Sequence, residues 1–163
     1  GSQFGVTIRL TREDKGLETA GGIINALPLL GDEPFILVNG DVWTTFDFSP
    51  LLDIKLNDDL AHLVFVSNPE QHPNGDFILA NGRAYIFEQE QQGENLTFSG
   101  VSVIHPRLFD GLEEGKRPLA PLLKQGMLDG KISAEKMQSA WVDVGTPERL
   151  MALDLQIRQG HYA

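Results

Sequence analysis

The sequence contains no cysteine, and no stretch of it reaches the roughly 18 consecutive apolar residues that a membrane span requires. Without cysteine there is neither a disulfide framework nor a thiolate zinc site. The first residues also lack the basic start and apolar core of a secretion signal. These absences exclude a disulfide-stapled or membrane-spanning class and make the cytoplasm the expected location.

Basic side chains are also scarce. Thirteen Lys and Arg face twenty-three Asp and Glu, so the net charge is −10. A charge of this sign repels a phosphate backbone at long range, which makes nucleic acid an unexpected partner. A substrate carrying phosphate would need a metal ion, or cations held elsewhere, to neutralise it.

Several catalytic signatures are missing. The chain has no G-x-x-x-x-G-K-[ST] loop, no G-x-G-x-x-G loop and no G-x-S-x-G elbow. The histidines show no ligand spacing of the zinc-hydrolase kind; they are His62, His72, His105 and His161. P-loop NTPases, dinucleotide-binding enzymes, serine hydrolases and zinc hydrolases are therefore disfavoured.

The length of 163 residues fits one domain spanning residues 1–163. Hydrophobic patterning predicts strands at 6–10, 34–38, 61–66, 98–104 and 141–144, a hairpin at 77–79 and 84–87, and helices at 19–30, 49–56, 106–112, 119–128 and 147–158. The continuous apolar run at 34–38 predicts a strand that is buried on both faces. Alternation of strand and helix predicts an α/β fold with a mostly parallel sheet and a small antiparallel insertion.

Two aspartates follow predicted strands. Asp41 lies in N-G-D after residue 38, and Asp143 lies in W-V-D-V-G-T before the last helix. Ligands in open α/β sheets sit beyond the carboxyl ends of strands, and Mg²⁺ takes one or two carboxylates together with substrate phosphates. Alternatively, Asp41 caps an Asn-Gly turn and Asp143 forms a turn or salt bridge at the helix start. The two residues together favour a metal site.

The segment L-E-T-A-G-G at 17–22 begins a predicted helix with small residues. Such a helix start is expected to present exposed, free backbone N–H groups, which can bind a base or an anion. A glycine pair alone is weak evidence for such a site.

Five segments occur in an order that no single motif provides: L-E-T-A-G-G, F-I-L-V-N-G-D-V-W, T-F-S-G-V-S-V-I-H-P, L-A-P-L-L-K-Q-G-M and W-V-D-V-G-T-P-E-R-L. With them the chain resembles the sugar-1-phosphate nucleotidyltransferases, most closely the N-acetylmuramate 1-phosphate uridylyltransferases of peptidoglycan recycling in the bacterial cell wall. The resemblance implies a Rossmann-like three-layer α/β/α sandwich. It also implies transfer of a nucleotidyl group from UTP to a sugar 1-phosphate, giving a UDP-sugar and pyrophosphate. Mannose- or glucose-1-phosphate enzymes using GTP or dTTP, and a non-catalytic sugar-nucleotide-binding fragment, are the alternatives.

The resemblance also assigns roles to individual positions. Asp41 and Asp143 match the catalytic aspartates that bind Mg²⁺. The nucleotide-binding positions match Glu18, Thr19, Ala20, Gly21 and Asn39, with Glu18 standing where many relatives have glycine. The sugar-binding positions match Gly75, Glu88, Ser99 and Gly100.

One part of the family pattern is missing. Such enzymes open with a strand and the loop G-x-G-x-R-x-x-P-L-T followed by a P-K pair, which hold the triphosphate, and neither occurs here. The resemblance therefore predicts the C-terminal part of a larger single domain, with little turnover from this piece alone. Its expected partners are a nucleoside triphosphate and a sugar 1-phosphate, together with the missing N-terminal segment or a second copy of the chain.

Overall fold

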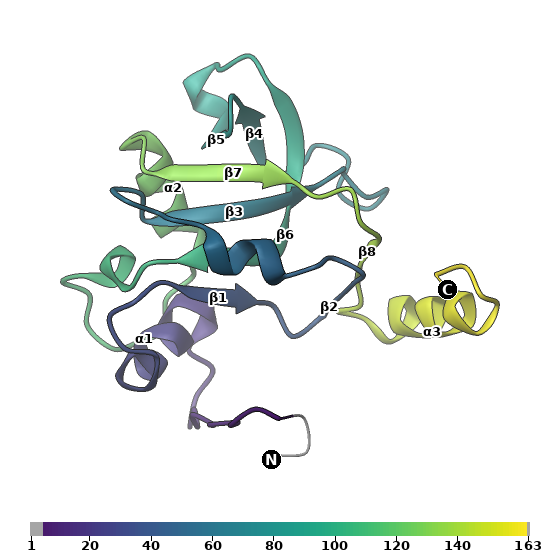
Figure 1. Ribbon diagram of the computed structural model, residues 1–163, viewed down its shortest axis with the longest axis horizontal. Helices are drawn as coiled ribbons and strands as arrows, with labels where there is room; N and C mark the ends of the chain where they lie inside the picture. Colours follow the sequence, from purple (N-terminus) through teal and green to yellow (C-terminus); the bar gives the residue numbers. More distant parts are fainter. Residues whose placement is uncertain (1–4, 163) are drawn as a thin grey trace.

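The computed structural model describes residues 5–162 as a mixed α/β fold (Figure 1). The strands are β1 (Phe35–Val38), β2 (Val42–Thr44), β3 (Ala61–Val66), β4 (Phe77–Ala80), β5 (Arg83–Tyr85), β6 (Glu94–Ile104), β7 (Ile132–Lys136) and β8 (Trp141–Asp143). The α-helices are α1 (Glu18–Leu30), α2 (Ala120–Leu128) and α3 (Pro147–Arg158). Short 3₁₀ turns cover Ser49–Asp53, Phe87–Gln89 and Pro106–Phe109.

The prediction of a mostly parallel sheet is wrong. The large sheet has the order β1-β6-β3-β7-β5-β4, and of its neighbours only β3 and β7 run parallel. β1 and β3 do share one direction, because both pair antiparallel with β6. The alternation of elements thus predicted the direction of these strands correctly. It could not reveal that the eleven-residue β6 inserts between them.

The core lies on both faces of this sheet. Buried residues of α1 and α2, such as Ile23 and Met127, pack with Leu63 and Phe65 of β3 on one face. On the other face, Leu51 and its neighbours pack with Val64 and Val101. The predicted helix at 49–56 is only a 3₁₀ turn, so this second layer is thin.

Some of the other local predictions are confirmed and others are wrong. The helices at 19–30, 119–128 and 147–158, the strand at 61–66 and the hairpin are confirmed within one or two residues. Residues 6–10 form no strand, and the side chain of Leu10 is 87% exposed. The 34–38 strand is an edge strand with Val38 exposed, and not a strand buried on both faces.

The second sheet positions the site. β2 and β8 form a two-stranded antiparallel ladder beside the large sheet, and α3 follows β8 directly (Figure 1). Thr146 caps α3, because its hydroxyl oxygen accepts the Arg149 backbone N–H at 3.3 Å, as the sequence predicts. Within residues 5–162 no helix combines the length and the apolar character that crossing a membrane requires.

Candidate active site

Asp41 and Asp143 converge on one point. In the β2–β8 ladder Val42 pairs with Asp143, and the Val144 N–H donates to the Asp41 carbonyl at 2.8 Å. A Cβ built on Gly145 would lie 3.0 Å from Oδ2 of Asp41 and 3.0 Å from Oδ1 of Asp143. The two carboxylates therefore lie against the same backbone position, Gly145, where an added Cβ would crowd both of them.

The two aspartates differ in how they are held. Oδ1 of Asp143 accepts the Gly145 N–H at 2.8 Å, and its Oδ2 lies 3.0 Å from Nη1 of Arg149. The turn and the salt bridge considered for Asp143 are thus both present. Within residues 5–162 the Asp41 carboxylate accepts no hydrogen bond, so it does not cap the Asn-Gly turn. The Asp41 carboxylate is exposed, and both of its oxygens remain available to bind a ligand.

A cavity of about 310 Å³, hereafter the aspartate cavity, opens at this point. The loops that follow β1 and β3 contribute to it, together with Trp141 and Asp143 of β8 itself. Its polar lining includes Asn39, Asp41, Gln71, His72, Asp76 and Asp143.

The donor set fits one hard divalent cation bound together with a ligand. Among residues 5–162 there is no cluster of three or more His, Asp or Glu side chains suited to a metal. A site built from protein ligands alone is therefore unsupported in this part of the chain. Two carboxylates that line one cavity instead suit Mg²⁺, which keeps its other positions for water or phosphate oxygens.

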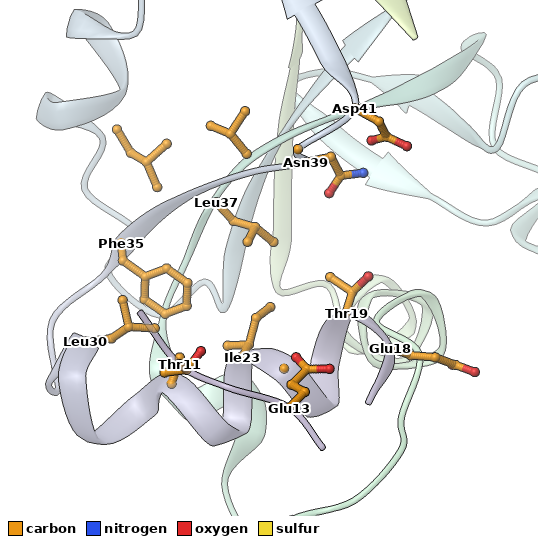
Figure 2. A pocket seen from close by; sticks show the side chains of 15 residues that line it. Thr11, Glu13, Glu18, Thr19, Ile23, Leu30, Phe35, Leu37, Asn39 and Asp41 are labelled. Carbon is orange, nitrogen blue, oxygen red and sulfur yellow. The ribbon is translucent and has the colours of Figure 1, made fainter. Parts of the chain in front are cut away.

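A second cavity, of about 670 Å³, lies between α1 and β1 and is hereafter the helix cavity (Figure 2). Glu18 and Thr19 line it from the start of α1, while Asn39 and Asp41 line it from the end of β1. Because Asn39 and Asp41 also line the aspartate cavity, the two spaces adjoin. Three of the five predicted nucleotide-binding residues thus lie around one space.

The other two, Ala20 and Gly21, do not line it. Both are buried, and their backbone N–H groups donate to the Arg117 carbonyl at 3.0 and 3.2 Å. The Leu17 N–H donates to a Glu13 carboxylate oxygen at 2.9 Å. The interpretation of this helix start as a set of free N–H groups is therefore wrong, because a neighbouring loop and a side chain already use three of them.

The start of α1 is held in an unusual backbone conformation. Glu18 has a φ of +60°, a left-handed value that favours glycine. A Cβ on Gly21 would come within 2.3 Å of the Gly115 carbonyl oxygen, so this position tolerates no side chain. Ala20 and Gly21 thus serve close packing of α1 against the 115–117 loop, and Thr19 is the member of the segment that faces the helix cavity.

The four predicted sugar-binding residues fall into two groups. Gly75 and Glu88 line a third cavity of about 300 Å³, hereafter the Glu88 cavity, whereas Ser99 and Gly100 line the aspartate cavity. Asp76 lines both and so stands between them.

Ser99 requires a revised interpretation. Its side chain is 1% exposed, its hydroxyl donates to the Val64 carbonyl at 2.6 Å, and the same oxygen accepts the Val101 N–H at 3.1 Å. The hydroxyl is therefore satisfied within the sheet and is unavailable to a ligand. Gly100 has a φ of +79°, and a Cβ there would come within 2.8 Å of the Asn39 side chain. Gly100 therefore allows the Asn39 side chain to pack directly against the backbone of β6.

Sequence reasoning missed four residues near the aspartates. Gly145 and Arg149 act on Asp143 as described above. Oδ2 of Asp76 accepts the Phe98 N–H at 2.9 Å, and its Oδ1 lies 3.0 Å from Nε2 of His72. Gly145 and Arg149 lie in the W-V-D-V-G-T-P-E-R segment, and Asp76 directly follows Gly75. Their closeness in the sequence to the predicted site residues is the feature by which they could have been found.

No family model matches the chain. Individual relatives do match. The chain is 44% identical over 155 residues to an N-acetylmuramate alpha-1-phosphate uridylyltransferase of Neisseria meningitidis serogroup B, covering 92% of this chain and 67% of that protein. It is 26% identical over 153 residues to a protein of the same name from Caulobacter vibrioides, covering 89% of this chain and 63% of the relative. The chain thus spans about two thirds of the length of these relatives.

A solved structure shares the fold. A Bacillus anthracis protein described as a glucose-1-phosphate thymidylyltransferase, crystallised with sucrose, superposes with a TM-score of 0.77 at 18% identity. The match covers 95% of this chain and 67% of that one. It confirms a nucleotidyltransferase-type α/β fold for the described residues.

Proposed function

The chain belongs to the sugar-1-phosphate nucleotidyltransferases, and we propose that the protein of which it is part transfers a uridylyl group from UTP to N-acetylmuramate 1-phosphate. The observation that carries this proposal is the meeting of Asp41 and Asp143 beside Gly145, where both line one cavity, in a chain 44% identical to a uridylyltransferase of that substrate. The products are the UDP-sugar and pyrophosphate.

The chemistry balances without a general base. An oxygen of the sugar phosphate forms a bond to the α-phosphorus of UTP, and the bond from that phosphorus to the pyrophosphate oxygen breaks. The second pKa of a phosphate is about 6, so the attacking oxygen is already ionised near neutral pH. Ser99, a hydroxyl residue lining the aspartate cavity, is not activated by a base, because its hydroxyl donates to the Val64 carbonyl. The protein's work is to position the two substrates and to offset their charge.

Asp41 and Asp143 would hold Mg²⁺. When bound, the ion supplies charge neutralisation at the phosphate oxygens. The carboxylate of Asp143 is oriented before a metal binds, because the Gly145 N–H contacts one of its oxygens and Arg149 contacts the other. Arg149 offsets part of the negative charge that two aspartates would otherwise impose on a phosphate.

Thr19, Glu18 and Asn39 would contact the nucleotide in the helix cavity, which all three line. Asn39 is fixed by its backbone N–H, which donates to the Gly100 carbonyl at 2.9 Å, and by the close approach of Gly100 beneath its side chain. Its amide can both donate and accept, as recognition of a nucleobase or ribose requires. Gly75 and Glu88 would contact the sugar in the Glu88 cavity, which both line.

The test is release of pyrophosphate by the purified protein of which this chain is part, with Mg²⁺, UTP and N-acetylmuramate 1-phosphate. GTP and dTTP replace UTP, and mannose 1-phosphate and glucose 1-phosphate replace the acceptor, in parallel reactions. The proposal predicts the highest kcat/KM for UTP with N-acetylmuramate 1-phosphate and no release in EDTA. A higher kcat/KM with mannose or glucose 1-phosphate would refute the assigned substrate. Binding of a UDP-sugar without pyrophosphate release would instead identify a non-catalytic fragment.

A further inference from the structure

The chemistry of the proposed acceptor raises a question of charge. N-acetylmuramate carries a carboxylate on its lactyl ether, which N-acetylglucosamine lacks. This chain has a net charge of −10, and the two candidate sugar cavities contain the carboxylates of Asp76 and Glu88. A second carboxylate brought close to these groups would be repelled unless a cation lies beside it.

The Glu88 cavity contains such a cation. Lys124 lines it together with Gly75 and Glu88. Within residues 5–162 the Lys124 ammonium forms no ion pair. Among the described residues, the one other potentially cationic side chain lining either sugar cavity is His72, and its ring already lies 3.0 Å from Asp76. In the part of the chain that the structure describes, Lys124 is therefore the cation of these cavities that has no ion-pair partner.

The position of Lys124 is set by a well-packed helix. Leu123 and Met127 of α2 are 2% and 0% exposed, so they anchor the helix against the large sheet. Ala120 and Lys124 are four residues apart on α2, which places them on one helix face, and both line the Glu88 cavity. Lys124 is thus presented toward this cavity from a rigid element.

We infer that Lys124 binds the carboxylate of an acidic sugar 1-phosphate and so determines the preference for N-acetylmuramate 1-phosphate over N-acetylglucosamine 1-phosphate. This inference rests on the proposed function and adds to it the residue that selects the acidic sugar. Phe87, 42% exposed in the same cavity, supplies an apolar surface for the methyl group of the lactyl ether.

The test is isothermal titration calorimetry of the purified protein with each of the two sugar phosphates. The variants are Lys124→Met, which keeps the length of the side chain and removes its charge, and Lys124→Arg, which keeps the charge. Lys131→Met is the matched control, because Lys131 is exposed and lines neither sugar cavity. Melting temperatures of all variants exclude a general loss of fold.

The inference predicts that wild type prefers N-acetylmuramate 1-phosphate and that Lys124→Met loses about 10- to 100-fold of that preference, the usual range for a hydrogen bond to a charged group. Lys124→Arg retains most of the preference and Lys131→Met retains all of it. If wild type shows the preference and Lys124→Met keeps it, the inference is wrong while the proposed function stands. If wild type shows no preference for the acidic sugar, the proposed substrate fails and the inference fails with it.

Discussion

The guanidinium of Arg149 lies against the carboxylate of Asp143, with 3.0 Å between Nη1 and Oδ2. Arg149 comes from the first turn of α3, whereas Asp143 ends β8. The contact therefore ties the orientation of one candidate metal ligand to the position of a helix.

Replacing Arg149 by Met should weaken metal binding more than it weakens the fold. Residues that orient a metal ligand typically contribute about 10- to 100-fold in metal affinity or activity. Binding of Mn²⁺, followed by electron paramagnetic resonance, gives the affinity directly. Arg158→Met is the control, because it removes an exposed ion pair with Asp154 far along the same helix. Equal Mn²⁺ affinities for Arg149→Met and wild type would refute the orienting role.

Gly100→Ala should disturb Asn39. Any side chain at position 100 must adopt a φ of +79° and push the Asn39 side chain, which lies within 2.8 Å of the added carbon. The matched control is Gly82→Ala, because Gly82 has a φ of +73° and nothing within 4 Å of the added carbon. Both variants should lose about 1–2 kcal/mol of unfolding free energy through backbone strain. Only Gly100→Ala should also weaken UTP binding, and similar UTP affinities for the two variants would contradict the placement of Asn39.

Glu18→Gly should stabilise the protein. The left-handed φ of +60° at this position costs an L-residue about 1–2 kcal/mol, which glycine avoids. The ion pair with Lys116 that is lost is largely exposed and contributes little. Urea unfolding measures the difference, and Glu18→Ala separates the causes, because it removes the ion pair while keeping the Cβ. Stabilisation by Ala equal to that by Gly would show that backbone strain is not the reason.

Stability should fall as the pH drops through the ordinary range of histidine. Burial lowers the pKa of His62 from its usual 6.5, and the nearby Glu135 only partly opposes this effect. The unfolded chain therefore binds more protons than the folded one between the lowered pKa and about 6.5, so acid favours unfolding. Urea unfolding at about pH 7.5 and 5.5 tests this, since these values bracket the ordinary titration of histidine. His62→Gln should flatten the dependence while the exposed-site control His161→Gln leaves it intact; an unchanged slope in His62→Gln would refute the assignment.

The sequence was most informative where local chemistry decides the structure. Thr146 followed by a proline and a glutamate correctly predicted the start of α3, and the alternation and turn residues around position 81 correctly predicted the β4–β5 hairpin. In both cases neighbours in the chain carry the signal. Asp41 and Asp143 were expected together at the ends of sheet strands, but they meet through the separate β2–β8 ladder, which the strand pattern did not predict.

What escaped prediction depends on long-range pairing. The antiparallel position of β6 between β1 and β3 is a tertiary arrangement without a local sequence signature. The N–H groups of Ala20 and Gly21 looked free in the sequence because their acceptor, the Arg117 carbonyl, lies almost a hundred residues later. Ser99 looked available for the same reason, since its hydroxyl is satisfied by Val64 on another strand.

The measurement that tests the account most directly is Mg²⁺-dependent pyrophosphate release by Asp41→Asn, compared with wild type and with the exposed-site control Asp32→Asn. The substitution keeps the size of the side chain and removes the charge that would hold the metal. We predict a loss of turnover of about 100-fold or more, in keeping with removal of one preorganised electrostatic contact, with an unchanged melting temperature. Wild-type turnover by Asp41→Asn, at the same Mg²⁺ concentration, would show that this carboxylate does not serve the metal and that the active site lies elsewhere.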